Sequence, residues 1–285
     1  PQNDVVLEAG NRYKYTVKVN ATGLTLAGCE IGKWSDGGGE SGAAEDLGYI
    51  YDNTTNTYTV YNADGLLVWA EAAQSDLSFN CTLTADIDLT GKQWTPIDQY
   101  GMSGYQGVFD GQGHCITGLA ITTESDNEPI TLFGCIGDKG TVKNLQLVNV
   151  RYNMKGISNS GGIATQNYGT ITACSVTGTI TTAGGNIGGI TLSNSGTITA
   201  CWFKGSLTGY HFAGGIATYN YNDVSACYWN GNVSSGIFSG TDETTKVNDD
   251  ESWQTAVDGM NAALTGNDYQ WALGTDGLPV LQKKP

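Results

Sequence analysis

One short unit occurs three times in succession from Gly161 onward, and this repeat constrains the fold more than any other feature of the chain. The copies read GGIATQNYGTITACSVTG, GGITLSNSGTITACWFKG and GGIATYNYNDVSACYWNG. Their cysteines, Cys174, Cys201 and Cys227, are separated by 27 and then 26 residues. A unit of this length cannot bury its own apolar side, so such repeats stack on one another.

Apolar residues recur at equivalent positions of the unit, which predicts columns of side chains inside the stack. Extended backward, the alignment places Leu145 where the later copies have cysteine. Residues two apart share one face of a strand, and a three-residue step breaks this alternation, so we expect a corner between the first two columns. The columns are Ile116, Val142, Ile171, Ile198 and Val224; Leu119, Leu145, Cys174, Cys201 and Cys227; and Ile121, Leu147, Val176, Phe203 and Trp229.

The residue types predict a mostly β protein. Thr, Val, Ile and aromatic residues fill the unit, with Gly and Asn at its breaks, which is typical of short strands and turns. Repeats of 26–29 residues stacked at ~4.8 Å per layer predict a parallel β-solenoid, either right-handed or left-handed. A propeller needs roughly 40–45 residues per blade, so this period is too short for one.

The unit GGIATQNYGTITACSVTG resembles the GLUG repeat, a glycine-rich motif of bacterial surface and secreted proteins. Some of these are regions accessory to immunoglobulin A peptidases. The strings LTADIDL and GVFDGQGHCI also resemble the entry coils of GLUG-type β-helices, so the resemblance covers roughly residues 64–235. The resemblance implies a single-stranded parallel β-helix, a pectate-lyase-like solenoid, and no particular catalytic activity.

Residues 1–62 lie outside the repeat and are rich in strand patterns. Alternation predicts strands around 13–19 and 24–31, a flexible turn at 34–39, and a hairpin over 48–61. The first two strands resemble the closing strands of fimbrillin-like adhesin domains. Because two strands make a marginal unit, we expect an upstream domain or another chain to complete them.

Two helices are predicted, one on each side of the repeats. Asp64 is a plausible N-cap for a helix over 65–75, and apolar residues at a spacing of three and four predict a second helix over 253–264, ended by Gly266. Short strands follow at 271–273 and 278–281. Each helix is expected to cover an open edge of the stack. The expected division is a strand-rich segment at 1–62, the β-helix at 63–240 and a C-terminal cap at 241–285.

The charge of the chain limits its partners. It has 28 acidic and 13 basic residues, a formal net charge of −15. Nucleic acids and anionic membrane surfaces are therefore not expected partners, since both need clustered Lys and Arg. The sequence has no apolar run of about 18 residues, so we expect no membrane-spanning segment. The composition and the resemblance favour a bacterial cell-surface or secreted protein.

The seven cysteines predict no metal site. Those at 174, 201 and 227 are expected to stack as free thiols that act as small hydrophobic groups. The sequence lacks the paired Cys and His spacing of a metal site, so we expect neither metal nor cofactor. Pairing is left open for the other four, Cys29, Cys81, Cys115 and Cys135.

The sequence also argues against catalysis. Its two histidines, His114 and His211, do not form the HExxH pattern of a metalloprotease. A hydrolase needs two carboxylates that face one groove, whereas Asp86, Asp88 and Asp110 lie in contexts typical of turns. The charged residues between 151 and 240 do not recur at the period of the coils. We therefore predict a protein without enzymatic activity.

Aromatic residues crowd the turns of the later coils and predict a binding surface. Exposed rings pack on sugar faces or on apolar protein patches, although they also stabilise corners by stacking on each other. We predict an adhesin-like protein that binds host or dietary glycans or extracellular matrix proteins. The alternatives are a β-helical polysaccharide lyase or hydrolase, marked by a groove with several charged side chains, and a structural spacer. The candidate binding residues are Tyr168, Tyr210, His211, Phe212, Tyr219, Tyr221 and Tyr228.

Overall fold

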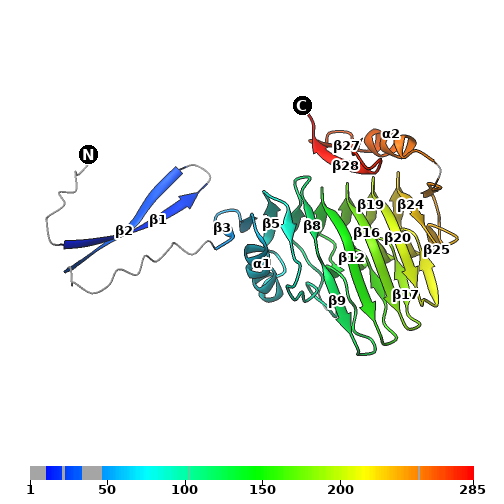
Figure 1. Cartoon of the computed structure of the whole chain (residues 1–285), viewed down its shortest axis with the longest axis horizontal. Coiled ribbons are helices and arrows are strands. Elements are labelled where there is room, and N and C mark those ends of the chain that lie inside the picture. The colour runs from blue at the N-terminus through cyan, green and yellow to red at the C-terminus, as the bar shows by residue number, and fades with distance from the viewer. Residues whose placement is uncertain (1–10, 21–22, 34–46, 102, 250) are drawn as a thin grey trace.

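The described part of the protein is a parallel β-solenoid of about six turns with two helices, as the sequence predicts. The structure, a computed structural model, describes residues 11–20, 23–33, 47–101, 103–249 and 251–285, and for residues 11–20 and 23–33 it describes the backbone only. Strands of successive coils lie side by side and form long parallel sheets that run the length of the stack (Figure 1).

Four sheets, numbered I to IV, form the walls of the solenoid. Sheet I contains β3 (Tyr49–Asp52), β4 (Thr57–Val60), β5 (Asn80–Leu83), β7 (Val108–Asp110), β11 (Thr141–Lys143), β15 (Thr170–Thr172), β19 (Thr197–Thr199) and β23 (Asp223–Ser225). Sheet II contains β6 (Ile87–Asp88), β8 (Cys115–Thr117), β12 (Gln146–Met154), β16 (Ser175–Thr182), β20 (Trp202–Thr208), β24 (Tyr228–Gly231) and β26 (Thr245–Lys246), with β9 (Ala120–Thr123) beside β12.

The remaining two walls are smaller. Sheet III contains β10 (Phe133–Ile136), β14 (Ala164–Asn167), β18 (Thr191–Asn194), β22 (Ala217–Asn220) and β25 (Ile237–Gly240). Sheet IV contains β13 (Ser160–Gly161), β17 (Asn186–Gly188) and β21 (Phe212–Gly214). Each complete coil therefore passes from sheet III to sheet I, then to sheet II and sheet IV.

The predicted columns are confirmed through the three repeats. The first column pairs Val142, Ile171, Ile198 and Val224 in register across sheet I. In the cysteine column, the backbone N–H of Cys174 donates to Sγ of Cys201 at 3.4 Å, which places the two residues on neighbouring levels. All three thiols of this column are buried and free. In sheet II, the third column pairs Leu147, Val176, Phe203 and Trp229.

One coil before the repeats, the predicted register is wrong. Val142 pairs with Phe109 rather than with Ile116, and Ile116 pairs with Leu147. The expected members of the other two columns shift in the same way. The backbone N–H of Arg151 donates to the carbonyl of Leu119 at 3.0 Å, and Ile121 pairs with Tyr152. The reason is a longer corner: seven residues separate 109 from 116, whereas five separate 142 from 147.

The predicted corner between sheets I and II is a single residue with a positive φ. Asn144, Ala173, Ala200 and Ala226 have φ values of 53°, 51°, 54° and 47°. Each directly precedes a member of the Leu145 and cysteine column, so one left-handed residue turns the chain at each of these four levels. This conformation is unfavourable for alanine and more tolerable for asparagine, so packing at the corner imposes it.

The N-terminal strands form as expected. β1 (Asn11–Asn20) and β2 (Gly23–Lys33) pair antiparallel, and the turn expected at 34–39 lies outside the described residues. The predicted hairpin is present as β3 and β4. However, β4 pairs parallel with β5, so this hairpin continues sheet I and the stack starts before the expected boundary at residue 63.

The first helix, α1 (Ala63–Ser75), lies at the N-terminal end of the stack, as predicted (Figure 1). Its N-cap is Asn62 rather than Asp64, because Oδ1 of Asn62 accepts the backbone N–H of Gly65 at 2.9 Å. Trp69 of α1 is fully buried, and its ring centroid lies 5.0 Å from that of Phe109. The helix therefore covers the interior of the first coils.

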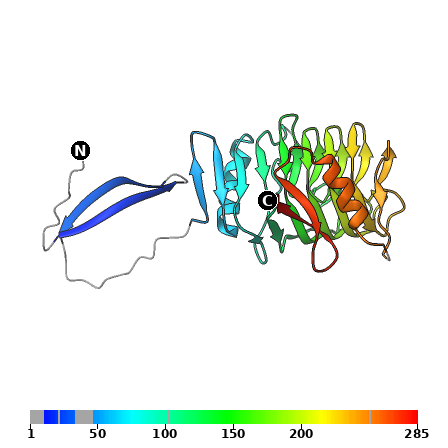
Figure 2. The same cartoon turned by 90° about the horizontal axis from the view of Figure 1, so that it is seen from above.

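The C-terminal segment packs against the side of the stack, whereas we expected it to cover an open edge. It comprises α2 (Gln254–Ala263), β27 (Tyr269–Leu273) and β28 (Pro279–Lys283), and it extends across several coils (Figure 2). Nε1–H of Trp271 donates to the carbonyl of Ala200 at 3.1 Å, and the Tyr269 hydroxyl donates to Gln112, three coils earlier. The apolar side chains of Ala173, Ala200 and Trp202 at the corner of the stack pack against Trp253 and Trp271 of this segment, which buries apolar area that the stack alone leaves open.

Candidate functional site

The outer face of sheet III brings together three of the predicted aromatic residues. Tyr168 and Tyr221 occupy the turns that follow β14 and β22, and they are 51% and 72% exposed. Tyr219 lies on the outer face of β22, in register with Ser193 of β18. Strand alternation explains this placement, because the neighbouring asparagine in each strand points inward and is buried.

Each ring is held over the face of the sheet by a residue two positions earlier. The Tyr168 hydroxyl donates to Oε1 of Gln166 at 3.3 Å. The Tyr221 ring lies nearly parallel to that of Tyr219, with 6.5 Å between centroids and 10° between planes. The Tyr219 hydroxyl in turn accepts Nδ2–H of Asn186, at 3.3 Å. We call this surface the aromatic strip: Gln166, Tyr168, Ser193, Ser195, Tyr219 and Tyr221.

A second aromatic group adjoins the strip at sheet IV. Phe212 pairs in register with Asn186, and its ring stacks on Phe238 with centroids 4.4 Å apart. His211 packs edge-on against Phe212 and is exposed, and Tyr210 is also exposed. Of these predicted residues, His211 and Phe212 therefore pack against each other, next to the strip.

Tyr228 does not join either aromatic group. It belongs to β24 of sheet II and packs, partly buried, against the cluster under the C-terminal segment. Burial raises the pKa of its hydroxyl. A Cβ added at Gly259 of α2 would lie 1.9 Å from that hydroxyl, so the helix approaches the ring very closely. Tyr228 therefore forms part of the contact between β24 and α2.

Tyr100 is an exposed ring that sequence reasoning missed. It lies in the segment between Ile97 and Tyr105, which both bridge to β10 and so add to the edge of sheet III. The ring is 71% exposed. The adjacent Gly101 lies close enough to the strip that an added Cβ would be 3.4 Å from Oε1 of Gln166. The only sequence signal was an aromatic residue in a Gly- and Ser-containing loop outside the repeat.

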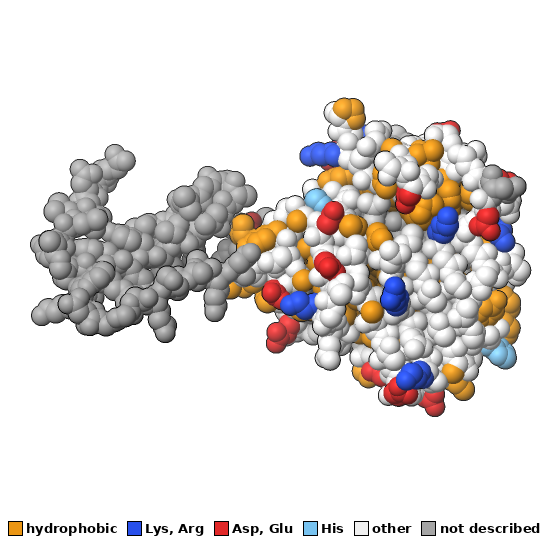
Figure 3. All heavy atoms as spheres, viewed as in Figure 1, with side chains coloured by type: hydrophobic (Ala, Val, Ile, Leu, Met, Phe, Trp, Pro, Cys, Tyr) orange, Lys and Arg blue, Asp and Glu red, His pale blue; other side chains and the backbone are white. Residues whose placement is uncertain are grey.

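The aromatic strip is uncharged. Strands β14, β18 and β22 and the turns that follow them, through residues 169, 196 and 222, contain no Asp, Glu, Lys or Arg. The charges of the molecule lie elsewhere: on the face of sheet II they stand singly or in mixed groups on a mostly uncharged surface (Figure 3). The strip therefore offers rings, amides and hydroxyls, which suit a neutral polar ligand.

A groove of about 690 Å³ meets the criterion that we set for an enzyme, because it is lined by Lys92, Glu124 and Glu128. Two of these charged side chains form ion pairs, which give them a structural role. Lys92 pairs with Asp64 at 2.6 Å, and Glu124 pairs with Lys155. These pairs tie the rim of the groove together.

The third charge of the groove has the wrong properties for a glycosidase acid. The Thr123 hydroxyl donates to Glu128 and holds the pKa of that carboxyl below its ordinary value. A general acid that protonates a glycosidic oxygen needs a raised pKa. The geometry of this groove therefore does not favour hydrolysis.

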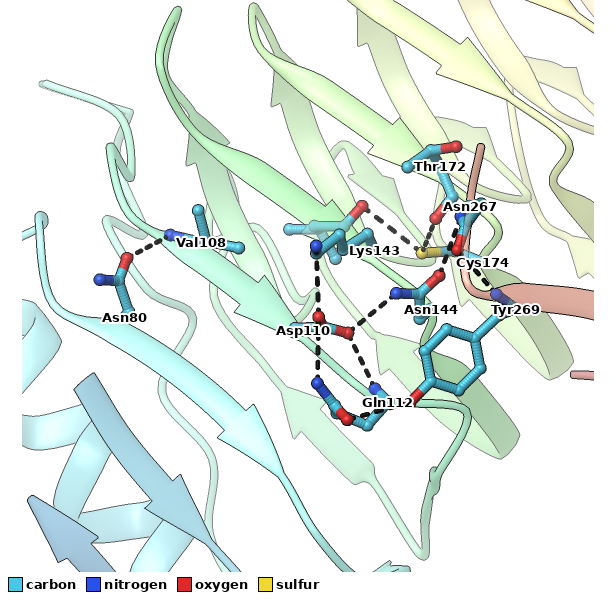
Figure 4. A network of polar contacts seen from close by, with 11 residues as sticks. Asn80, Val108, Asp110, Gln112, Lys143, Asn144, Thr172, Cys174, Asn267 and Tyr269 are labelled. Atoms are coloured by element: carbon cyan, nitrogen blue, oxygen red, sulfur yellow. Dashed lines mark hydrogen bonds and ion pairs between the residues drawn. The ribbon is translucent and has the colours of Figure 1, made fainter. Parts of the chain in front are cut away.

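Asp110 is the centre of a polar network that attaches the C-terminal segment (Figure 4). Its carboxylate accepts Nδ2–H of Asn144 at 2.9 Å and the backbone N–H of Gln112 at 2.9 Å, and it lies 3.3 Å from Nζ of Lys143. Tyr269 donates to Oε1 of Gln112 at 2.9 Å. With both oxygens of Asp110 engaged, this network is a structural junction between β7, β11 and β27.

The other two candidate carboxylates also stabilise turns. Asp86 accepts the backbone N–H of Cys115 at 3.0 Å and lies 3.2 Å from Nδ1 of His114. Asp88 accepts the backbone N–H of Thr90 at 2.8 Å. These contacts fit the turn-forming role expected from the sequence.

The described cysteines are made unreactive by their surroundings. Cys81 and Cys135 are buried and Cys115 is partly buried, and all three are free, so they do not pair with one another. The side chain of Cys29 lies outside the described residues. Burial raises the pKa of Cys115 and of Cys135 to about 11, and it raises the pKa of Cys201 as well. Protonated thiols are poor nucleophiles and poor metal ligands. Within the described ranges, no group of three or more His, Cys, Asp or Glu side chains is placed to hold a metal ion.

Comparison with known proteins gives two similarities, and no protein-family profile matches the chain. A relative from Evansella cellulosilytica, named "Putative Gly-rich membrane protein", is 37% identical over 95 residues, which are 33% of this chain. The chain matches 11% of that relative's length. A solved structure from Bacteroides ovatus, titled a "putative immunoglobulin A1 protease", is 16% identical with a TM-score of 0.46, covering 80% of this chain and 93% of that chain. Neither helix of the described structure has the length and apolarity needed to cross a membrane.

Proposed function

We propose that this protein binds glycans without catalysis, as an adhesin-like protein at the bacterial cell surface or after secretion. The observation that carries the proposal is the aromatic strip. Tyr168 and Tyr221 present exposed rings, and uncharged polar side chains lie between them. The same surface has no charged residue with which to perform acid–base chemistry.

The chemistry of the strip suits a sugar better than a protein patch. A pyranose ring has an apolar face, which packs on an aromatic ring, and a rim of hydroxyl groups, which exchange hydrogen bonds with amides and hydroxyls. Gln166 and Asn186 supply amides beside the rings of Tyr168 and Tyr219. A protein interface of stable size would instead centre on a buried apolar core, and the strip is mainly polar.

The surface location rests on composition and on the curated relative. The sequence is rich in Gly and only 14% of its residues are charged, which is typical of extracellular β proteins. The name of the Evansella relative assigns that relative to a membrane. Host or dietary glycans remain the proposed ligands. An upstream domain or another chain is the proposed partner of β1 and β2.

A glycan array tests the proposal, with the unmodified chain compared with the double variant Tyr219→Ala, Tyr221→Ala. We expect the chain to bind a subset of the glycans and the double variant to lose about tenfold or more in affinity, because it lacks both stacked rings. Tyr51→Ala is the control, since Tyr51 is an exposed ring on sheet I, away from the strip. Equal binding by the double variant would exclude this surface, and an array with no bound glycan would favour the structural spacer.

A further inference from the structure

The turn after each strand of sheet III carries one residue at the same place on every level. Tyr168 donates its backbone N–H to Ile136, Ser195 donates to Asn167, and Tyr221 donates to Asn194. Each donor therefore lies one coil above the residue that follows its acceptor in the sequence. Tyr168 lies above Gly137, Ser195 above Tyr168, and Tyr221 above Ser195. With the pairing of Asn220 with Gly240, the row on successive levels is Gly137, Tyr168, Ser195, Tyr221 and Thr241.

Over these five levels the row alternates between small residues and rings. Tyrosine occupies the second and fourth levels, Gly, Ser and Thr occupy the other three, and Gln106 precedes Gly137 one level earlier. Two layers of strands at ~4.8 Å separate equivalent atoms of Tyr168 and Tyr221 by ~10 Å along the axis of the solenoid. Both rings are held in place, by Gln166 and by Tyr219 respectively. The surface thus presents two rings that lie two coils apart, and we call this spacing the ruler.

We propose that the aromatic strip binds an extended, neutral, β-linked polysaccharide along the axis of the solenoid, with one disaccharide for every two coils. This inference rests on the proposed glycan binding. In an extended β-linked chain each sugar is turned over relative to the one before it, so the same sugar face recurs once per disaccharide. That repeat is close in length to two layers of the stack. Ser195 leaves room for the intervening sugar, which a larger side chain would fill.

The absence of charge on the strip selects among the polysaccharides. A uronic acid polymer carries one carboxylate per sugar, and the strands and turns of the strip provide neither Lys nor Arg to pair with it. The net charge of −15 repels such a polymer further. Coiled α-linked glucans do not present equivalent faces along a straight line, so they meet one ring at most.

The class of glycan is tested by calorimetry and affinity electrophoresis with defined oligosaccharides. The neutral β-linked probes are cellohexaose, mannohexaose, xylohexaose and chitohexaose, and the comparison probes are maltohexaose, hexagalacturonate and the disaccharide of each neutral series. We expect at least one neutral β-linked hexaose to bind about tenfold or more tightly than its disaccharide, since only the hexaose reaches both rings. We expect it to bind more tightly than either comparison hexaose.

Variants at the row test the spacing. Tyr168→Ala and Tyr221→Ala should each weaken binding of the hexaose about tenfold and make it resemble that of the disaccharide. Ser195→Tyr adds a third ring between them. If the two-coil spacing matters, this variant binds the hexaose less tightly, whereas tighter binding would overturn the ruler. The control Ser239→Ala changes a residue on the outer face of β25 without altering the row.

The outcomes separate this inference from the proposed function. Preference for maltohexaose or hexagalacturonate that is lost in the Tyr219→Ala, Tyr221→Ala variant overturns the inference and keeps the glycan-binding strip. Equal affinity for disaccharide and hexaose also overturns it. Failure of all four neutral hexaoses to bind overturns it as well, and if the glycan array is blank too, the proposed function falls with it.

Discussion

Three buried asparagines, one in each of β14, β18 and β22, form a ladder directly before the turns that carry the strip. Nδ2–H of Asn167 donates to Oδ1 of Asn194 at 2.8 Å, and Nδ2–H of Asn194 donates to Oδ1 of Asn220 at 2.9 Å. Each side chain also donates to a backbone carbonyl of the next coil, namely that of Thr197, Asp223 or Thr241. In the preceding coil Ile136 occupies the equivalent position and offers no side-chain donor, so Oδ1 of Asn167 has no hydrogen-bond partner. The ladder therefore ties successive coils together at the turns that carry Ser195 and Tyr221.

Replacing the central member of the ladder should be costly. We expect Asn194→Ala to lower the free energy of unfolding by about 3 kcal/mol, because it removes the buried hydrogen bonds that Asn194 makes to both neighbouring asparagines and to the carbonyls of Gly196 and Asp223. Chemical denaturation measures the loss. The control is Asn248→Ala, an exposed asparagine whose change should stay within about 0.5 kcal/mol. Equal stability of the two variants would contradict the role of the ladder.

The contact between Thr123 and Glu128 should make stability depend on pH in one direction. It holds the folded pKa of Glu128 below its ordinary value of 4.5, so it stabilises the fold above that pH and is lost as the pH falls through the folded pKa. We expect Thr123→Val to be less stable than the unmodified chain at pH 7, and the difference to shrink as the medium is acidified below about pH 4. Denaturation across this range measures it, and Thr122→Val, the same change at an exposed threonine of the same strand, is the control. A difference that stays constant with pH would rule out the charge-assisted contact.

At the scale of elements, α1 closes one end of the solenoid with a single large side chain. The ring of Trp69 contacts those of Tyr105, Phe109 and Phe133, with centroids 6.0, 5.0 and 6.3 Å away. A stack of β-coils otherwise exposes its interior at the first level, and an uncovered strand edge invites pairing with another chain. The helix thus stabilises the coils and keeps them from associating.

Truncation of this side chain should therefore affect both stability and solubility. We expect Trp69→Ala to cost about 3–5 kcal/mol, because the site is fully buried among rings that cannot close the cavity. Denaturation gives the loss, and light scattering reports association of the exposed coils. Val68→Ala, on the exposed side of the same turn, is the matched control. If both variants behave alike, α1 does not seal the stack.

At the scale of the whole molecule, the charged residues lie apart from the aromatic strip, the proposed ligand-binding surface. The net charge of −15 lies outside the strands and turns of the strip. A surface of rings, amides and hydroxyls binds by packing and by neutral hydrogen bonds, neither of which salt screens. The acidic remainder keeps the molecule soluble and repels anionic surfaces.

This separation predicts that glycan binding is insensitive to salt. We expect the affinity for the glycan that the array identifies to change by less than about twofold between roughly 0.05 and 0.5 M sodium chloride. Calorimetry at several salt concentrations measures it. A steep fall in affinity with salt would show that charged residues outside the strip carry the binding.

The accuracy of the sequence predictions followed the regularity of the chain. Within the repeats, a constant period made the columns through Cys174 and Cys201 readable, because stacked layers force equivalent residues to coincide. One coil earlier, two extra residues in the corner after Phe109 moved Ile116 to another sheet. In the candidate site, Tyr168, Tyr219 and Tyr221 were predicted, whereas Tyr100 and the polar neighbours Gln166 and Asn186 were not.

The sequence alone determined the stacked architecture, since periodic burial of apolar side chains has one economical solution, a coil that repeats at each layer. It also located both helices from their spacing. Only the tertiary structure decided which rings share a face, because that depends on where each strand leaves its sheet. It also decided where the C-terminal segment lies, because α2 and β27 pack on a corner assembled from several coils. Local patterns specify elements, but contacts between residues as distant as Gln112 and Tyr269 arise only when the chain is folded.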